Sequence, residues 1–88
     1  MILFLIHCGF YDEEISNGIY EFHVNIPVVA NNLDEAKKKV RTDRIFQQKK
    51  MHIDGIQEIK SVDGFSVDLS PSASSVKTSI TSHQYRDL

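Results

Sequence analysis

Apolar residues follow two different patterns along the first thirty positions. The short unbroken run Ile2–Cys8, which closes on Gly9, predicts a strand buried on both faces and central in its sheet. Residues 20–28 alternate instead, which predicts a strand with one apolar and one polar face. The polar face carries Glu21, His23 and Asn25. Pro27 cannot donate to a ladder, so this second strand ends there, lies at a sheet edge or is bulged.

A helix is predicted next. Asn32 is its N-cap, with Glu35 three residues later in a capping-box arrangement. A narrow apolar stripe docks this helix on the sheet, and Phe46 closes its far end near residues 46–48. The stripe consists of Leu33, Ala36 and Val40.

The segments 53–62 and 65–69 predict a hairpin around the turn dipeptide Asp63-Gly64. A two-residue loop would place Lys60 opposite Val67. A three-residue loop that ends in a left-handed Gly64 would align Ile59, Val67 and Phe65 on one face. We favour the three-residue loop because it buries a consistent apolar set.

Together these elements predict an α+β domain over residues 1–69. The expected sheet is small, four-stranded and antiparallel or mixed, in β-β-α-β-β order, with one helix on one face. Residues 70–88 hold eight Ser or Thr and predict a Ser-rich tail, in which Val76–Ile80 adds a strand to a neighbour. The second sheet face would expose apolar residues, so we expect a homodimer.

Length, net charge and cysteine content limit the kinds of partner and compartment that we expect for this protein. Eighty-eight residues allow one domain, and a formal net charge of −2 gives no global field toward nucleic acid or membrane. The N-terminal apolar run has no preceding Lys or Arg and about half the usual length of a signal segment. The single cysteine, Cys8, fits a reducing compartment. We therefore expect a cytoplasmic protein with no membrane partner and no cofactor.

Five segments in order resemble one family. They are the opening strand ending at Gly9, Ile19–His23 (similar to N-[ILV]-E-x-H-D), Val28–Ala30 before a helix with Glu35-Ala36, Met51–Asp54 (similar to L-H-I-D), and Val62–Phe65 (similar to V-D-G-Y). The chain resembles, over residues 2–69, the bacterial family catalogued as domain of unknown function 1543. It departs from that pattern where Val24 replaces an expected Asp and where an expected Trp is absent. The resemblance implies no activity, and a site that used that Asp would be altered here.

Two carboxylate–imidazole pairs are the candidates for chemistry. Residues i and i+2 of a strand share a face, so Glu21 lies beside His23, and His52 beside Asp54. If the pairs converge, they form a metal or acid–base site. If they do not, the first pair is the solvated side of a strand and the second forms a local turn. We favour the second interpretation and expect no bound metal.

Basic residues concentrate in one stretch. Seven of the ten Lys and Arg lie between residues 37 and 50, which predicts a positive face for an anion or nucleic acid. The candidate ligand-binding residues are Lys37, Lys38, Arg41, Arg44 and Lys49. The only aromatic residue in that stretch is Phe46, which we expect to be buried, and no nucleic-acid motif is present, which favours a solvated helix face. His7 and Cys8 point to opposite strand faces and so cannot form a nucleophile–base pair; we expect Cys8 to be buried.

The sequence therefore favours a non-enzymatic binding or assembly module that acts as a homodimer. Anion or nucleic-acid binding through residues 37–50 is one alternative. A metal or acid–base site built from two carboxylates and two imidazoles is the other, and it requires Glu21, His23, His52 and Asp54 to meet.

Overall fold

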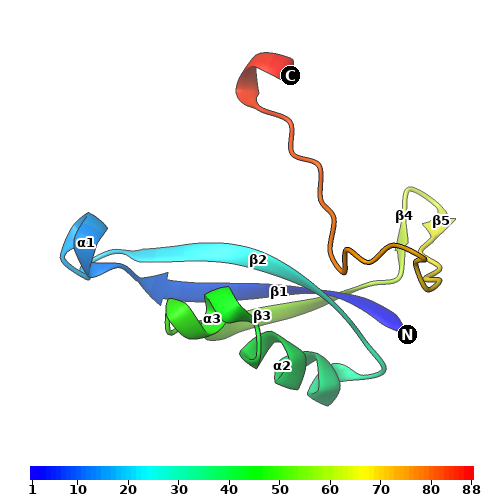
Figure 1. The fold of residues 1–88 in the computed structure, drawn as a ribbon, viewed down its shortest axis with the longest axis horizontal. Coiled ribbons are helices and arrows are strands. Elements are labelled where there is room, and N and C mark those ends of the chain that lie inside the picture. The colour runs from blue at the N-terminus through cyan, green and yellow to red at the C-terminus, as the bar shows by residue number, and fades with distance from the viewer.

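A three-stranded antiparallel sheet forms the centre of the molecule. The computed structural model describes the backbone of residues 1–88 and every side chain except that of Ser16. Strand β1 (Ile2–Tyr11) lies between β2 (Glu21–Ala30) and β3 (His52–Ile59) and is antiparallel to both, as Figure 1 shows. The predicted central position of the first strand is confirmed, but its predicted burial on both faces is wrong, because Leu3 and Leu5 are only half-buried and His7 is exposed. Strands β2 and β3 run parallel to each other on either side of it.

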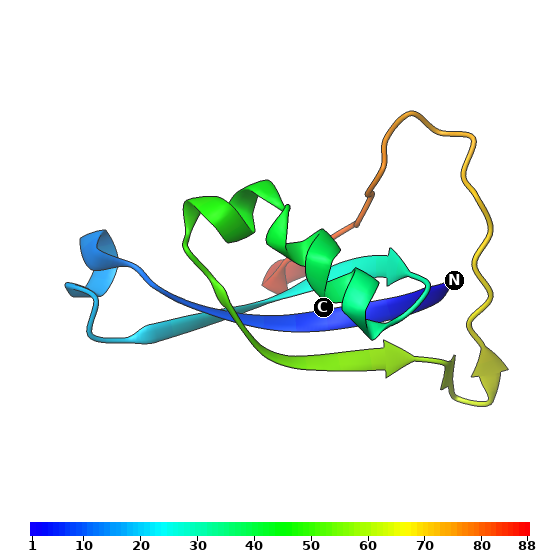
Figure 2. The same ribbon diagram turned by 90° about the horizontal axis from the view of Figure 1, so that it is seen from below.

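Two helices cover one face of this sheet (Figure 2). They are α2 (Leu33–Arg41) and α3 (Arg44–Gln48), where the sequence predicted one helix ending near residues 46–48. The break has a local cause, because the Asp43 side chain accepts from the N–H groups of Ile45 and Phe46 and so caps a new helix. The predicted first cap is confirmed, since the Asn32 side chain accepts from the Glu35 N–H at 2.8 Å.

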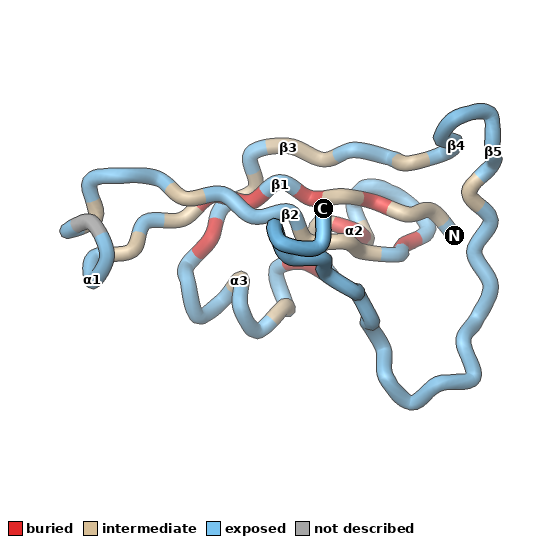
Figure 3. Tube along the Cα trace, turned by 90° about the horizontal axis from the view of Figure 1, so that it is seen from above, coloured by how far each residue is buried: buried red, intermediate tan, exposed pale blue. Residues whose placement is uncertain are grey.

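The core lies between the helices and the even-numbered side of β1. Phe4, Ile6 and Cys8 are fully buried there, and Ala36 and Val40 of α2 belong to the same core cluster. Figure 3 shows that exposed segments surround the few buried ones. Phe46 packs against this core as predicted. Leu33 does not, because 45% of it is exposed at the first turn of α2.

Strand β3 contains a bulge that the sequence analysis missed. Gly55 pairs with His7 and Ile53 pairs with Cys8, so Asp54 is an extra residue opposite the bond between them. The bulge shifts the alternation, and Ile53 and Ile56 therefore both pack against the core although they are three residues apart. The side chains of His52 and Asp54 therefore lie on the opposite face of the sheet.

The predicted four-stranded sheet is wrong. Strands β4 (Ser61–Val62) and β5 (Phe65–Ser66) form a separate two-stranded sheet. The pairing of β3 with β1 ends at Leu3 and Ile59, and β4 begins beyond the end of that pairing. The favoured three-residue loop is wrong as well.

The observed turn has two residues. Val62 pairs with Phe65 across Asp63 and Gly64, whose φ angles are 53° and 81°. Two consecutive positive φ angles are those of a type I′ turn, whose twist matches that of the strands. The alternative register is the observed one, and the Val67 N–H donates to the Lys60 carbonyl at 2.9 Å.

Helix α1 (Glu13–Ser16) lies in the β1–β2 connection, and the tail after β5 ends in a single 3₁₀ turn, η1 (Tyr85–Asp87). The tail leaves on the side opposite α2 and α3 (Figure 1), and all of residues 70–88 are exposed. Residues 77–80 border a groove of about 350 Å³ together with Leu3, Pro27 and Val29. Strand addition by Val76–Ile80 to a neighbour stays a prediction. Among the described residues, no helix has the length and apolar composition needed to cross a membrane.

Candidate metal centre

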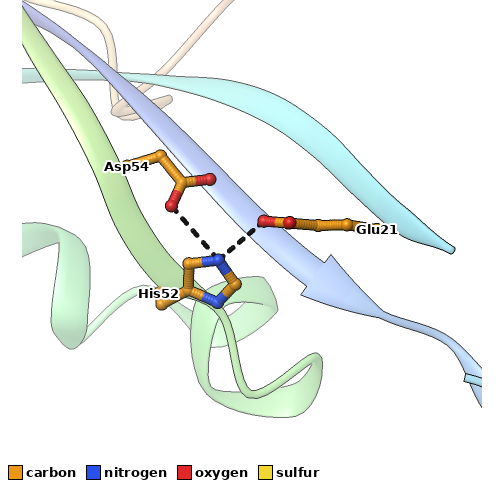
Figure 4. Close-up of side chains that lie close together, drawn as sticks. All are labelled: Glu21, His52 and Asp54. Carbon is orange, nitrogen blue, oxygen red and sulfur yellow. Dashed lines mark hydrogen bonds and ion pairs between the residues drawn. The ribbon is translucent and has the colours of Figure 1, made fainter. Parts of the chain in front are cut away.

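The two carboxylate–imidazole pairs meet on the open face of the sheet, opposite the helices. The Nε2 atom of His52 lies 2.7 Å from Glu21 Oε1 and 3.2 Å from Asp54 Oδ1. Figure 4 shows the His52 ring between the two carboxylates. Strands β2 and β3 flank β1 and do not pair with each other, yet their side chains join across it. The two pairs therefore converge, and the favoured interpretation, in which they do not meet and His52 and Asp54 form a local turn, is wrong.

His23 closes the group. Its Nε2 atom lies 3.2 Å from Glu21 Oε1 and 3.1 Å from Asp54 Oδ2. Imidazole nitrogens and carboxylate oxygens thus alternate around a ring of four contacts. We call Glu21, His23, His52 and Asp54 the His–carboxylate cluster.

Gly9 forms the floor of this cluster. It is buried in the middle of β1, opposite His23 on one side and His52 on the other. A Cβ atom at this position would lie 2.6 Å from both Asp54 Oδ2 and His52 Nε2, and would collide with Glu21 Oε1. The cluster occupies the space that any larger residue would fill.

The spacing of the donor atoms suits a small cation. A tetrahedral ion with bonds of about 2.0–2.1 Å holds its ligand atoms about 3.3 Å apart. The four nitrogen–oxygen contacts measure 2.7, 3.2, 3.2 and 3.1 Å. Donor atoms of Glu21, His52 and Asp54 all lie within 4.8 Å of one another. That group does not include His23, so the His23 ring has to move inward to complete a coordination sphere of four ligands.

The cluster is open to solvent and has neighbours on the same face. Its side chains are 30–46% exposed, so a ligand reaches it without any element moving. The Tyr11 hydroxyl donates to Glu21 Oε2 at 3.5 Å, which uses the carboxylate oxygen that faces away from the imidazoles. The His7 ring stacks on that of His23, a contact that the sequence analysis did not anticipate.

The predicted anion-binding residues lie on the other side of the molecule, along α2 and α3. Lys37 pairs with Asp34 at 3.6 Å, and Lys49 pairs with Asp12 at 3.1 Å. The remaining members of that set, Lys38, Arg41 and Arg44, are exposed. Two of the five candidates therefore already have carboxylate partners, and the basic face and the His–carboxylate cluster are separate features.

Cys8 is buried on the helix side of β1, whereas His7 is exposed on the open side, as predicted. Burial raises the pKa of the Cys8 thiol, and the charges of Asp54 and Asp43 raise it further. A thiol held in its protonated form is a poor nucleophile and a poor ligand. Cys8 therefore belongs to the core and not to the site.

Comparison with known proteins gives one result. The sequence model of the family described as Domain of Unknown Function (DUF1543) matches residues 19–69, which is more than half of the chain. The chain belongs to this family. The resemblance seen in the sequence is thus confirmed, and no curated protein and no solved structure matches the chain significantly.

The family match includes all four residues of the His–carboxylate cluster and excludes Gly9 and the tail. Val24, which departs from the expected family pattern, pairs with Cys8 and therefore lies on the helix face. That departure leaves the cluster on the open face intact.

Proposed function

We propose that this protein is a metal-binding domain whose ligands are Glu21, His23, His52 and Asp54. One observation carries the proposal, namely the ring of four nitrogen–oxygen contacts directly above Gly9. The ion would bridge β2 and β3 across β1. This departs from the sequence expectation of no metal and of a binding or assembly module, and takes up the alternative of a metal site built from these four residues.

The donor set favours a divalent first-row transition ion. Imidazole suits Zn²⁺, Fe²⁺, Co²⁺, Ni²⁺ and Cu²⁺, whereas Ca²⁺ and Mg²⁺ prefer sets made only of oxygen. Two imidazoles and two carboxylates leave a bound divalent ion neutral overall. Because the cluster is partly exposed, an ion there also keeps access to water, so Lewis-acid chemistry is compatible with the site.

Protein titrated with Zn²⁺ and followed by calorimetry tests the proposal. We expect one ion per chain and proton release on binding, because ligating imidazoles must be neutral. Co²⁺ should give visible d–d absorption typical of mixed nitrogen and oxygen ligands. His52→Ala and Glu21→Gln should each weaken binding by at least about tenfold, since each removes a direct ligand.

His83→Ala is the matched control, because His83 is an exposed tail residue that lies outside the cluster. It should leave affinity and stoichiometry unchanged. Equal Zn²⁺ affinity in His52→Ala and in the natural chain would overturn the proposal. A preference for Ca²⁺ or Mg²⁺ over Zn²⁺ would also contradict it.

Homodimerisation stays a prediction. The feature that motivated it is present, because Leu3, Leu5 and Pro27 are only half-buried on the open face and Val29 is 37% exposed. Residues 77–80 of the same chain border part of this apolar area. Light scattering at several protein concentrations measures whether a second copy covers the rest.

A further inference from the structure

His7 and Asn25 form a pair beside the His–carboxylate cluster. They are cross-strand partners in the β1–β2 register, and His7 Nδ1 lies 2.7 Å from Asn25 Oδ1. An amide oxygen only accepts, so the His7 Nδ1 carries the hydrogen and donates it. This bond fixes the His7 ring at a defined angle above the sheet.

The ring so fixed lies flat against His23. The two ring centroids are 4.8 Å apart and the ring planes differ by 4°. His23 sits opposite Gly9, which has no side chain, and thus diagonally from His7 on the neighbouring strand. Diagonal cross-strand neighbours are within reach of aromatic side chains. The His7 ring is therefore the surface that limits rotation of the His23 imidazole.

Rotation of that imidazole matters for a metal ligand. The lone pair on Nε2 lies in the plane of the ring, so an imidazole binds an ion only when the ion is close to that plane. A ring that turns freely loses conformational entropy on binding, whereas a ring already held flat loses less. Partners outside the ligand set commonly change metal affinity by about 10–100-fold.

From these contacts we infer that His7, held by Asn25, is a positioning residue that aims His23 Nε2 at the metal position. The inference rests on the proposed metal site. His7 acts through the flat face of its ring, and Asn25 acts by fixing that ring. The sequence hides this role, because His7 is distant in the chain from both His23 and Asn25 and is adjacent to a core residue.

Three variants separate ring stacking from other effects. His7→Ala removes both the ring and its donor, His7→Phe keeps the flat ring, and Asn25→Ala removes the acceptor. We expect His7→Ala to weaken Zn²⁺ binding by at least tenfold and to shift the d–d bands of the Co²⁺ form. His7→Phe should recover affinity to within about threefold of the natural chain. The Zn²⁺ affinity of Asn25→Ala should lie between those of His7→Ala and His7→Phe.

A Co²⁺ spectrum and an affinity that are unchanged in His7→Ala would overturn the inference. So would a His7→Phe protein as weak as His7→Ala, because that result removes the stacking explanation. His83→Ala again controls for loss of an exposed histidine.

An NMR measurement on the metal-free protein separates this inference from the proposed function. Ring-to-ring NOEs between His7 and His23 are expected in the natural chain and should vanish in His7→Ala. If they are present and no metal binds, the proposed function fails while the stacked pair stands. If they are absent, the positioning role fails whether or not the protein binds metal.

Discussion

Gly9 lies directly beneath the carboxylate of Asp54. A Cβ atom on Gly9 would come within 2.6 Å of Asp54 Oδ2, closer than such atoms approach in folded proteins. The bulge in β3 brings Asp54 over this position, and the missing side chain at Gly9 leaves room for it. The cluster thus depends on a residue that cannot itself bind an ion.

We predict that Gly9→Ala abolishes tight metal binding and leaves the fold intact. The atoms that would meet the new methyl group are the ends of flexible side chains and not backbone, so they turn away at little cost. Gly9 does not have a positive φ angle, so alanine fits its backbone. Zn²⁺ affinity should fall by about a hundredfold, as measured by calorimetry, while the far-ultraviolet circular dichroism spectrum stays the same.

Gly55→Ala provides the matched control for that substitution. Gly55 is also a strand glycine without a positive φ angle, and a Cβ atom there would meet nothing within 4 Å. It pairs with His7 on the same central strand. Affinity in Gly55→Ala should remain within about threefold of the natural value. Equal losses in both variants would show that strand flexibility, and not space above Gly9, controls the site.

Metal binding should also stabilise the fold. The cluster connects β2 and β3, which both pair with β1 and not with each other. An ion that binds the folded state alone raises the free energy of unfolding by about 2.7 kcal/mol at a hundredfold excess over its dissociation constant. Urea unfolding with and without Zn²⁺ measures this difference. The difference should fall to about half or less in Asp54→Asn, because a site at least tenfold weaker is stabilised less by the same ion concentration. An unchanged difference there would place the ion elsewhere.

Part of this fold is readable from local sequence pattern. The unbroken run Ile2–Cys8 indicated a central strand, and β1 does pair with a strand on each side, although only its helix-facing side chains are fully buried. Asn32 indicated a helix start because its side chain replaces a missing backbone acceptor. Asp43 was the signal for the helix break. It is an acidic capping residue inside an apparent helix, and its competing hydrogen bonds to the backbone decided the outcome.

Local sequence pattern did not predict that the four residues of the His–carboxylate cluster would meet. Their convergence depends on the order of strands in the sheet and on the register across β1, both of which are long-range properties. The bulge at Asp54 did have a local signal. Ile53 and Ile56 are spaced by three within a strand, and an isolated glycine, Gly55, stands between them. Strict alternation of side chains along a strand cannot bury both isoleucines on one face, so a bulge with one extra residue between them was required.

The substitution Ile6→Val should cost about 0.5–1.5 kcal/mol of unfolding free energy, because Ile6 is fully buried and its lost methyl group leaves a cavity. Ile19→Val makes the same chemical change at a position that is 69% exposed. That variant should stay within about 0.5 kcal/mol of the natural chain. Urea unfolding of the three proteins gives the comparison, and equal costs would contradict the placement of the core.

Cys8 should resist thiol reagents in the folded protein. Burial raises the pKa of its thiol, and the charges of Asp54 and Asp43 add to that effect, so little thiolate forms near neutral pH. Ellman's reagent should react slowly with native protein and rapidly in denaturant. The sign of the pH effect follows from the raised pKa. The stability contributed by the protonated thiol is present below the unfolded pKa of about 8.5 and is lost as pH rises through the folded value.

The ion pair of Asp12 and Lys49 should make stability depend on acid pH. The hydrogen bond from Lys49 lowers the pKa of the Asp12 carboxyl, against a smaller opposing effect of desolvation, and the backbone N–H groups of Glu14 and Ile15 lower it further. A lowered pKa means that the folded state binds the proton less tightly than the unfolded state. This stabilisation is therefore present above the unfolded pKa of about 3.9 and is lost as pH falls through the lower, folded value.

Asp12→Asn isolates that contribution, because asparagine keeps a side-chain acceptor for the Glu14 N–H and removes the charge. The natural chain should be more stable than Asp12→Asn at pH 6, and the difference should shrink as pH falls below about 3.9. Lys49→Gln should reduce the same pH dependence, because it removes the cation at the C-cap of α3 that pairs with Asp12 at the N-cap of α1. Urea unfolding at pH 6, 4 and 3 measures all three proteins. A difference that stays constant over this range would show that the charge of Asp12 does not cause the pH dependence.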